Sequence, residues 1–245
     1  MKPVRFCASR AMFNQLGVFP KRIESELAKR GVGLCFKFPP DFHRWELQVG
    51  DETFPAPDSR MFSRSKMFFH RHLREHGFRF LITEHLDDFD RLEELLGLPF
   101  VAKPDSGSNG RFIRLIRNRA DFIAAKANHC DIAQEYVPNG DEDYRFTVVG
   151  GKVIAAIRRI ARKGEFRANI SQGARFEKYQ PTPDQIAEVK KLSTSMRIPI
   201  GGFDVFKSGL IGEVNLGATF NHTEAATGIN VIGMIAEYLI LRSQS

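Results

Sequence analysis

Two acidic residues on neighbouring predicted strands constrain this chain most. The stretch Gly202 to Asn215 carries a turn signal, Ser208-Gly209, between two apolar-rich runs, and this pattern predicts a β-hairpin. A turn centred there places Asp204 directly opposite Glu213, with Asn215 further along on the same face as Glu213. Opposed like charges repel, and burying them without a cation costs several kcal/mol.

These three side chains offer only hard oxygen ligands. Such a set is typical of Mg²⁺ or Mn²⁺, which commonly keeps water ligands and bridges substrate phosphates. The alternative interpretation is a solvated hairpin with ordinary surface acids. The hairpin alone leaves both interpretations open, so the choice depends on what the rest of the chain provides.

The charge of the chain restricts its partners. Thirty-six Lys and Arg against 29 Asp and Glu give a net charge of +7 and a pI near 9.4. A basic surface favours anionic partners such as nucleotides, acidic peptides or nucleic acid. The basic residues form no polybasic tail or recognisable DNA-binding motif, so nucleic acid is the least favoured of these.

Nothing in the sequence indicates a membrane or disulfide-bonded protein. No run approaches the roughly 18 to 20 apolar residues of a membrane span, and the N-terminal MKPVRFCASR lacks the apolar core of a signal peptide. Cys7, Cys35 and Cys130 are scattered without a CxxC pair, which indicates reduced thiols. We therefore expect a cytoplasmic protein without a membrane partner, and the sequence leaves its oligomeric state, a homo-oligomer included, open.

The predicted elements divide the chain at about residue 62. Residues 1–62 read as a small α/β module with a hairpin over 45–54, and this module ends in the Pro-rich stretch 55–58. A more regular pattern fills 63–245. The elements predicted in this second part are helices at 65–76 and 86–96, strands at 100–103, 111–116 and 132–137, a helix that Asn118 caps, a Gly150-Gly151 hairpin over 144–158, a helix capped at Thr182, the acidic hairpin, a loop to Gly228 and a helix at 229–241.

Lys103 ends a predicted strand and precedes a loop of small residues. The loop sequence, PDSGSNG over residues 104–110, leaves backbone N–H groups exposed enough to hold phosphate, and the lysine would neutralise phosphate oxygens. It is not a Walker A motif, which requires GxxxxGK[ST]. An ordinary turn is the alternative interpretation.

Charged residues follow the Gly150-Gly151 turn. In the register of a two-residue turn, Asp143 opposes Arg158, and further arginines continue to Arg167. Such a cluster is usually solvated, but it also suits a transferring phosphoryl group. His70 and His72 do not share a face of their predicted helix, so they are not predicted to be metal ligands.

Five motifs in order carry a family resemblance: FVAKPDSGSNG, QEYV, DEDYRFTVVGGKVIAAIRR, EFRANISQGARF and GFDVFKSGLIGEVN. Together they resemble the ATP-grasp superfamily, above all its RimK-type carboxylate-amine ligases and next the prokaryotic glutathione synthetases. The resemblance covers residues 63–241. It implies an α+β ATP-grasp fold whose two α/β subdomains, at 63–137 and 138–245, clamp ATP behind a shortened N-terminal α/β module at 1–62.

The resemblance also implies roles for individual residues. Arg167 and Asn169 are expected to be catalytic, with Ala168 in place of the family's serine. Asp204, Glu213 and Asn215 are expected to bind Mg²⁺ or Mn²⁺, as two ions, and the segment 223–228 to border the substrate. The expected ATP contacts are Lys66, Lys103, Ser106, Gly107, Ser108, Asn109, Gly110, Glu135, Tyr136, Val137, Asp143, Arg145, Arg167, Ala168 and Asn169.

The activity implied is amide-bond formation. In this family a substrate carboxylate attacks the γ-phosphate of ATP to form an acylphosphate, and an amine then displaces phosphate. The partners expected are ATP, a carboxylate and an amine, drawn from amino acids, peptides or acidic proteins. The alternative is an ATP-binding module without ligase activity that acts in regulation or interaction, because the N-terminal module is shorter than is usual in the family.

Overall fold

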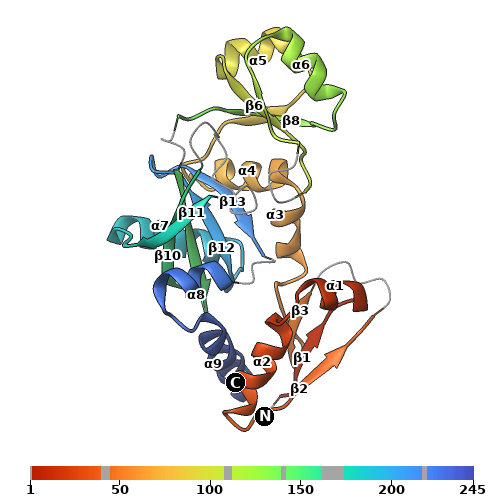
Figure 1. The fold of residues 1–245 in the computed structure, drawn as a ribbon, viewed down its shortest axis with the longest axis vertical. Coiled ribbons are helices and arrows are strands. Elements are labelled where there is room, and N and C mark those ends of the chain that lie inside the picture. Colours follow the sequence, from red (N-terminus) through yellow and green to blue (C-terminus); the bar gives the residue numbers. More distant parts are fainter. Residues whose placement is uncertain (1, 40–44, 108–111, 139–141, 162–173, 217–219) are drawn as a thin grey trace.

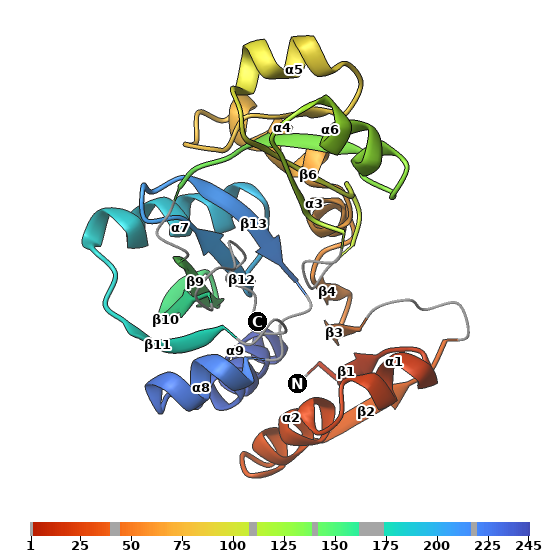
Figure 2. The same cartoon turned by 45° about the horizontal axis from the view of Figure 1, so that its top comes forward.

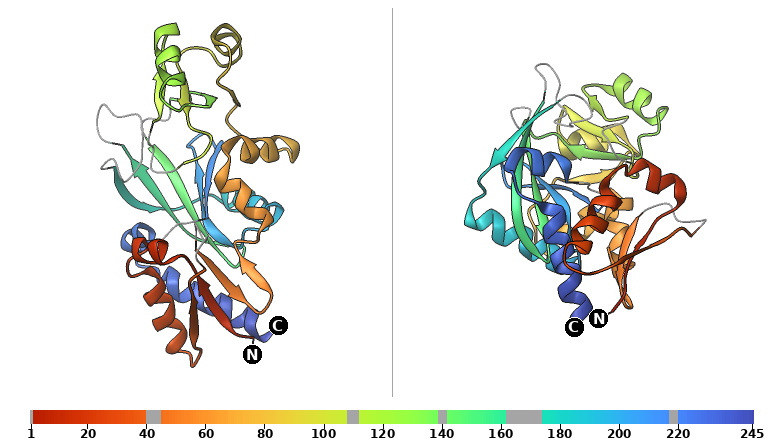
Figure 3. Two further views of the ribbon diagram at one scale, coloured as in Figure 1. Left: turned by 90° about the vertical axis from the view of Figure 1, so that its right-hand side faces the viewer. Right: turned by 60° about the horizontal axis from the view of Figure 1, so that its bottom comes forward.

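The strands that the structure describes form three sheets stacked along the long axis of the protein (Figure 1). A computed structural model describes residues 2–39, 45–107, 112–138, 142–161, 174–216 and 220–245. The strand orders are β2-β1-β3-β4 in the first sheet, β5-β8-β6-β7 in the second and β11-β10-β9-β12-β13 in the third. The third sheet lies between the other two, as the left view of Figure 3 also shows. One sheet falls in each of the predicted segments 1–62, 63–137 and 138–245, although the boundaries themselves stay a prediction.

The first sheet belongs to the N-terminal module. Its strands are β1 (Val4–Cys7), β2 (Leu34–Lys37), β3 (Glu46–Val49) and β4 (Glu52–Phe54), and its helices are α1 (Arg10–Gln15) and α2 (Phe19–Ala28). β1 pairs parallel to β2 and antiparallel to β3. The predicted hairpin of this module is confirmed as β3–β4, where Gly50 adopts φ +58°, a conformation that favours glycine.

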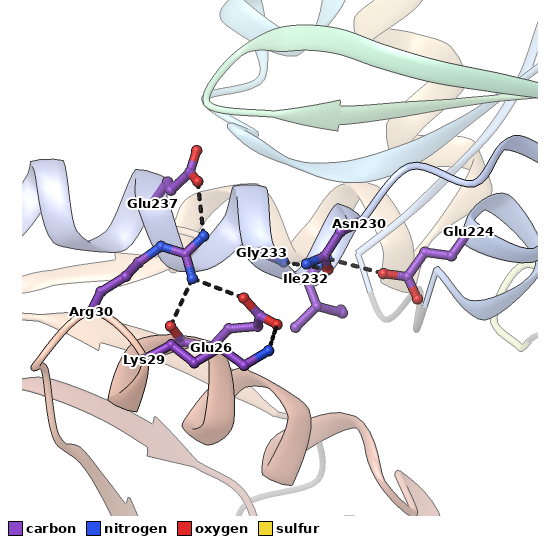
Figure 4. Close-up of polar contacts among 8 residues, drawn as sticks. All are labelled: Glu26, Lys29, Arg30, Glu224, Asn230, Ile232, Gly233 and Glu237. Atoms are coloured by element: carbon purple, nitrogen blue, oxygen red, sulfur yellow. Dashed lines mark hydrogen bonds and ion pairs between the residues drawn. The ribbon is translucent and has the colours of Figure 1, made fainter.

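The C-terminal helix α9 (Val231–Gln244) completes the core of this module. Ile235, Leu239 and their neighbours on α9 pack in one apolar cluster with the strands and with α2. At the edge of this contact Arg30, two residues after the end of α2, donates to Glu26 and, across the interface, to Glu237 of α9, both at 2.8 Å (Figure 4). The two ends of the chain therefore lie side by side, as Figure 2 shows.

α8 (Asn221–Thr227) precedes α9 and was not predicted, because a loop was expected up to Gly228. No helix among the described residues is long and apolar enough to span a membrane alone, and only α8 and α9 taken together, bent by 115°, pass a test of length and composition. Gly228 ends α8 at φ +71°, where a side chain would be strained.

The second sheet is antiparallel and carries two helices. It consists of β5 (Thr83–His85), β8 (Ile132–Glu135), β6 (Phe100–Lys103) and β7 (Arg114–Ile116), covered by α5 (Phe89–Leu96) and α6 (Arg119–Lys126). The predicted cap is confirmed, because the Asn118 side chain accepts from the backbone of Asp121. Helix α5 begins later than predicted, because Asp88 caps it and leaves Leu86 outside.

The third sheet is antiparallel throughout. Its strands are β9 (Glu142–Val149), β10 (Lys152–Ile160), β11 (Arg175–Tyr179), β12 (Ile200–Val205) and β13 (Ile211–Asn215). The capping box predicted at Thr182 is confirmed at the start of α7 (Pro183–Ser195). After a short 3-10 turn (Asp58–Arg60) and α3 (Met61–Arg64), helix α4 (Lys66–Glu75) packs Phe69 and Leu73 into the core of this sheet.

The predicted register of the Gly150-Gly151 hairpin is wrong by one residue. Asp143 pairs with Arg159, and Arg158 pairs with Tyr144. The cause is a bulge between Val153 and Ala155, which adds a residue to β10 after a regular start at the turn. A bulge of this kind leaves no mark in the pattern of apolar residues, yet it turns Arg159 toward Asp143.

We expect the contact between α9 and the N-terminal module to contribute strongly to stability. Leu239→Ala removes a fully buried side chain and should lower the free energy of unfolding by about 2 to 5 kcal/mol. Leu241→Ala is the matched control, since Leu241 lies on the same helix and is 65% exposed; its effect should stay within about 0.5 kcal/mol. Urea unfolding of both variants checks this, and equal effects would contradict the packing described.

Candidate active site

The acidic hairpin forms as predicted. β12 and β13 pair antiparallel, with Asp204 opposite Glu213 and Gly202 opposite Asn215. The turn closes where Gly209 donates to the Phe206 carbonyl, and Gly209 adopts φ +82°. The register that the sequence predicts for the two acids is therefore confirmed.

Two arginines compensate the charge of Asp204. Arg145, directly opposite on β9, donates from Nε to Oδ1 and from Nη2 to Oδ2, both at 2.7 Å. Nη2 of Arg159, on β10, lies 2.9 Å from the same Oδ2. Asn215 adds a donor to Oδ2 at 3.2 Å. The charge of Asp204 is thus compensated by arginines of the chain itself, whereas the expected cation between Asp204 and Glu213 stays a prediction.

Arg159 also holds a second carboxylate. Its Nε and Nη2 donate to the two oxygens of Asp143, at 2.5 and 2.7 Å. Burial acts to raise the pKa of Asp204, but Arg145 and Arg159 outweigh it and hold that pKa well below the usual range. Burial raises the pKa of Asp143, and Arg159 opposes this rise. Two guanidinium groups and two carboxylates thus form one cluster across β10, β9 and β12.

Removing one member should destabilise this cluster strongly. Arg159→Met keeps a long side chain but leaves the Asp143 carboxylate without its partner and buried Asp204 with one guanidinium instead of two, and should lower the free energy of unfolding by about 3 to 5 kcal/mol. Arg91→Met is the matched control, because Arg91 and Asp87 form an exposed ion pair at 2.8 Å, expected to contribute at most about 1 kcal/mol. Urea unfolding measures both, and losses of the same size would contradict the buried role of Arg159.

The donor set of the hairpin fits a hard divalent cation. Oδ1 of Asp204 accepts one hydrogen bond and so keeps a lone pair. Within the described part of the chain the Glu213 carboxylate accepts no hydrogen bond, and Asn215 uses only its amino group. The same part holds no cluster of three or more His, Cys, Asp or Glu suited to a metal, so an ion here would rely on two acids, Asn215 and water.

Lys103 belongs to another sheet but is near enough to Glu213 for that carboxylate to act on its charge. It ends β6, it is buried, and its ammonium donates to Oε1 of Gln134 at 2.7 Å. Burial lowers the pKa of Lys103 to about 8, against an opposing effect of the Glu213 carboxylate. The fold therefore brings together a predicted phosphate lysine and a predicted metal ligand that are far apart in the sequence.

Lys66 secures the start of the small-residue loop. It is the first residue of α4, and its ammonium donates to the carbonyls of Asp105 and Gly107, both at 3.2 Å. Asp105 in turn accepts from the backbone of Met67 at 2.8 Å. Ser106 lies in this anchored stretch, and Gly107 has φ +124°, which favours glycine. The remaining loop residues of the prediction, Ser108, Asn109 and Gly110, lie outside the described residues.

The other predicted residues occupy distinct places. Glu135 ends β8, where its backbone N–H donates to the Ile82 carbonyl and burial raises the pKa of its side chain. Tyr136 and Val137 follow the strand. The predicted catalytic segment Arg167, Ala168 and Asn169 lies outside the described residues.

The segment 223–228 lies mainly on α8. Thr223 is buried beside Thr147, with 3.1 Å between their hydroxyl oxygens. Glu224 forms an ion pair with Arg22 of α2 at 2.6 Å. The predicted substrate border is therefore joined to the N-terminal module.

Sequence reasoning missed three buried polar residues near these positions. Arg159 escaped because the bulge in β10 cannot be read from the sequence. Gln134 stood in the QEYV motif without a role, although a glutamine directly after the apolar Ile132 and Ala133 of a predicted strand was an available signal. His70 was set aside as a metal ligand, and no local pattern shows that it faces Gln134.

Comparison with protein families agrees with this arrangement. The family model described as the RimK-like ATP-grasp domain matches residues 69–239. A probable alpha-L-glutamate ligase of Aeromonas salmonicida (strain A449) is 31% identical over 194 residues, which are 74% of this chain and 65% of that protein. A protein of the same name from Legionella pneumophila (strain Corby) is 31% identical over 190 residues, 72% of this chain and 63% of its own. The chain thus spans less than two thirds of these relatives.

Solved structures share the fold. The ATP-grasp ligase PsnB, complexed with minimal precursor, Mg and ADP, superposes with a TM-score of 0.72 at 14% identity, over 98% of this chain and 97% of the other. D-alanine–D-alanine ligase from Bacillus anthracis complexed with ATP gives a TM-score of 0.70 at 15% identity, over 98% and 96%. The α+β ATP-grasp fold expected from the sequence is thereby confirmed.

Proposed function

Because the chain belongs to the RimK-like ATP-grasp family, we propose that it is an ATP-dependent carboxylate-amine ligase which forms an amide bond through an acylphosphate. The observation that carries this proposal is that the charge of Glu213, on the third sheet, acts on the buried ammonium of Lys103, on the second, where helix α4 contacts both sheets. A lysine and an oxygen ligand set on two adjoining sheets suit a polyphosphate bound between those sheets.

The proposed reaction has two steps. A carboxylate oxygen of the substrate attacks the γ-phosphorus of ATP, and the bond to the β-phosphate oxygen breaks to release ADP. An amine nitrogen then attacks the acyl carbon, phosphate leaves with the C–O bond electrons, and the nitrogen loses a proton. Both steps move negative charge through one small region, so fixed positive groups there favour the reaction.

Residues of this chain have defined roles in that scheme. The Lys103 ammonium neutralises phosphate oxygens, and the anchored loop that follows it excludes water from the acylphosphate. Asp204, Glu213 and Asn215 would hold Mg²⁺, which when bound stabilises charge on the transferring phosphoryl group. Arg145 and Arg159 keep Asp204 ionised for that purpose. Arg167 and Asn169 are proposed to meet the γ-phosphate and the reacting carboxylate.

The substrate class follows from charge and relatives. The curated relatives are named alpha-L-glutamate ligases, so we propose L-glutamate as the amine. A net charge of +7 suits an acidic peptide or protein as the carboxylate partner, through attraction that weakens with salt. PsnB, a structure of the same fold, was solved with a precursor peptide, which agrees with a peptide acceptor.

Glu213→Gln should separate catalysis from folding. With ATP, Mg²⁺, L-glutamate and a panel of acidic peptides, we expect phosphate release to fall about a hundredfold or more, because the amide is a poor metal ligand. Glu94→Gln, an exposed change on α5, is the control and should leave the rate unchanged. Normal turnover by Glu213→Gln would contradict the metal assignment, and ATP binding without amide product across the panel would favour a non-catalytic ATP-binding module.

A further inference from the structure

His70 lies at the junction of the second and third sheets. It is on the face of α4 that also carries Phe69 and Leu73, and only 2% of it is exposed. α4 contacts β13 of the third sheet and β5 of the second, and Figure 1 shows it between the two. An imidazole buried at such a place carries two polar nitrogens that need partners.

One of these nitrogens joins a short hydrogen-bonded chain to Lys103. Nε2 of His70 lies 3.0 Å from the amide nitrogen of Gln134, and the amide oxygen of Gln134 accepts from Lys103 at 2.7 Å. The same amide nitrogen lies 2.7 Å from the hydroxyl oxygen of Thr83. Thr83 commits its own proton to the Leu81 carbonyl, at 3.0 Å. Both protons of the Gln134 amide nitrogen and its oxygen are therefore used.

The direction of every hydrogen bond in this chain is fixed. An ammonium has no acceptor, so Gln134 must present its oxygen to Lys103 and its NH₂ group to the other side. Nε2 of His70 must then accept, which places the ring proton on Nδ1. Burial, followed by the charge of Lys103, lowers the pKa of His70 well below its ordinary value, and the neutral ring that this favours can accept.

The second nitrogen is buried on the helix that packs against β13. Nδ1 of His70 is buried and has no hydrogen-bond partner of good geometry among the residues that the structure describes. The backbone of Gly212 on β13 is nevertheless close enough to act on the ring and favours its charged form. Gly212 directly precedes Glu213, so His70 lies between Gln134, the partner of Lys103, and the metal strand.

We propose that His70 is a positioning residue which, through Gln134, holds the ammonium of Lys103 at a fixed place relative to β13. The inference rests on the proposed role of Lys103 in ATP binding. The function of His70 would be to keep the phosphate lysine at a constant position relative to the metal ligands, although the two belong to different sheets. A residue that only filled space would serve as well with an apolar side chain and would leave no polar atom to satisfy.

Two isosteric variants separate positioning from packing. In His70→Gln the amide oxygen can reach the place of Nε2 and accept from Gln134. In His70→Asn the shorter amide reaches only the place of Nδ1, so Gln134 loses that acceptor. His70→Leu fills the site without any acceptor and replaces the Asn variant should that one fail to fold. His72→Asn, half-buried on the same helix, is the control.

The first measurement is the affinity for ATP with saturating Mg²⁺, by isothermal titration calorimetry on the full chain. We expect His70→Asn and His70→Leu to raise Kd about tenfold, and His70→Gln and His72→Asn to stay within about threefold of the unaltered protein. Gln134→Met should raise Kd similarly, and adding His70→Asn to it should change little, because His70 acts through Gln134. Equal affinities for all His70 variants, or equal losses, would overturn the proposal.

A second readout needs no nucleotide. The rate at which acetic anhydride acylates Lys103, followed by mass spectrometry, reports how well its ammonium is held, because only the neutral amine reacts. His70→Asn should acylate faster, and His70→Gln should match the unaltered protein; identical rates would overturn the proposal. Should Lys103→Met bind ATP normally while these rates still differ, the proposed function fails and the positioning role of His70 stands.

Discussion

The ion pairs of Asp204 with Arg145 and Arg159 are the interaction on which the candidate site depends. A carboxylate at this depth would otherwise favour its neutral form, and a neutral acid is a poor ligand for a cation. Because the three residues lie on adjacent strands, the sheet fixes their geometry before any ligand binds. The pairing of the strands thus places two arginines beside Asp204, and these arginines keep its carboxylate ionised.

The second constraint is that the site is shared between sheets. Lys103 comes from the second sheet and Glu213 from the third, and helix α4 contacts both sheets. The N-terminal module is joined to the same assembly at the other end, because α9 completes its core and Arg22 reaches Glu224 on α8. A substitution in the N-terminal module that shifts α2 or α9 can therefore also shift α8, which carries the predicted substrate border.

Local signals in the sequence predicted much of this fold, and contacts between distant segments escaped it. The Asp204–Glu213 register, the Thr182 capping box and the Asn118 cap follow from nearby residues and were predicted. The pairing of Asp143 with Arg159 was missed, because one bulged residue shifts the strand without altering its pattern. The contact of His70 with Gln134 joins residues 64 positions apart, which no periodicity shows.

The central claim is that Lys103 and Glu213 act on the same polyphosphate, one directly and the other through a metal. The most direct test is a double-mutant cycle of Lys103→Met and Glu213→Gln on the Kd for ATP with Mg²⁺ present. We predict that the loss of binding free energy in the double variant differs from the sum of the single losses by about 1 kcal/mol or more. Additivity within about 0.3 kcal/mol would contradict a shared site.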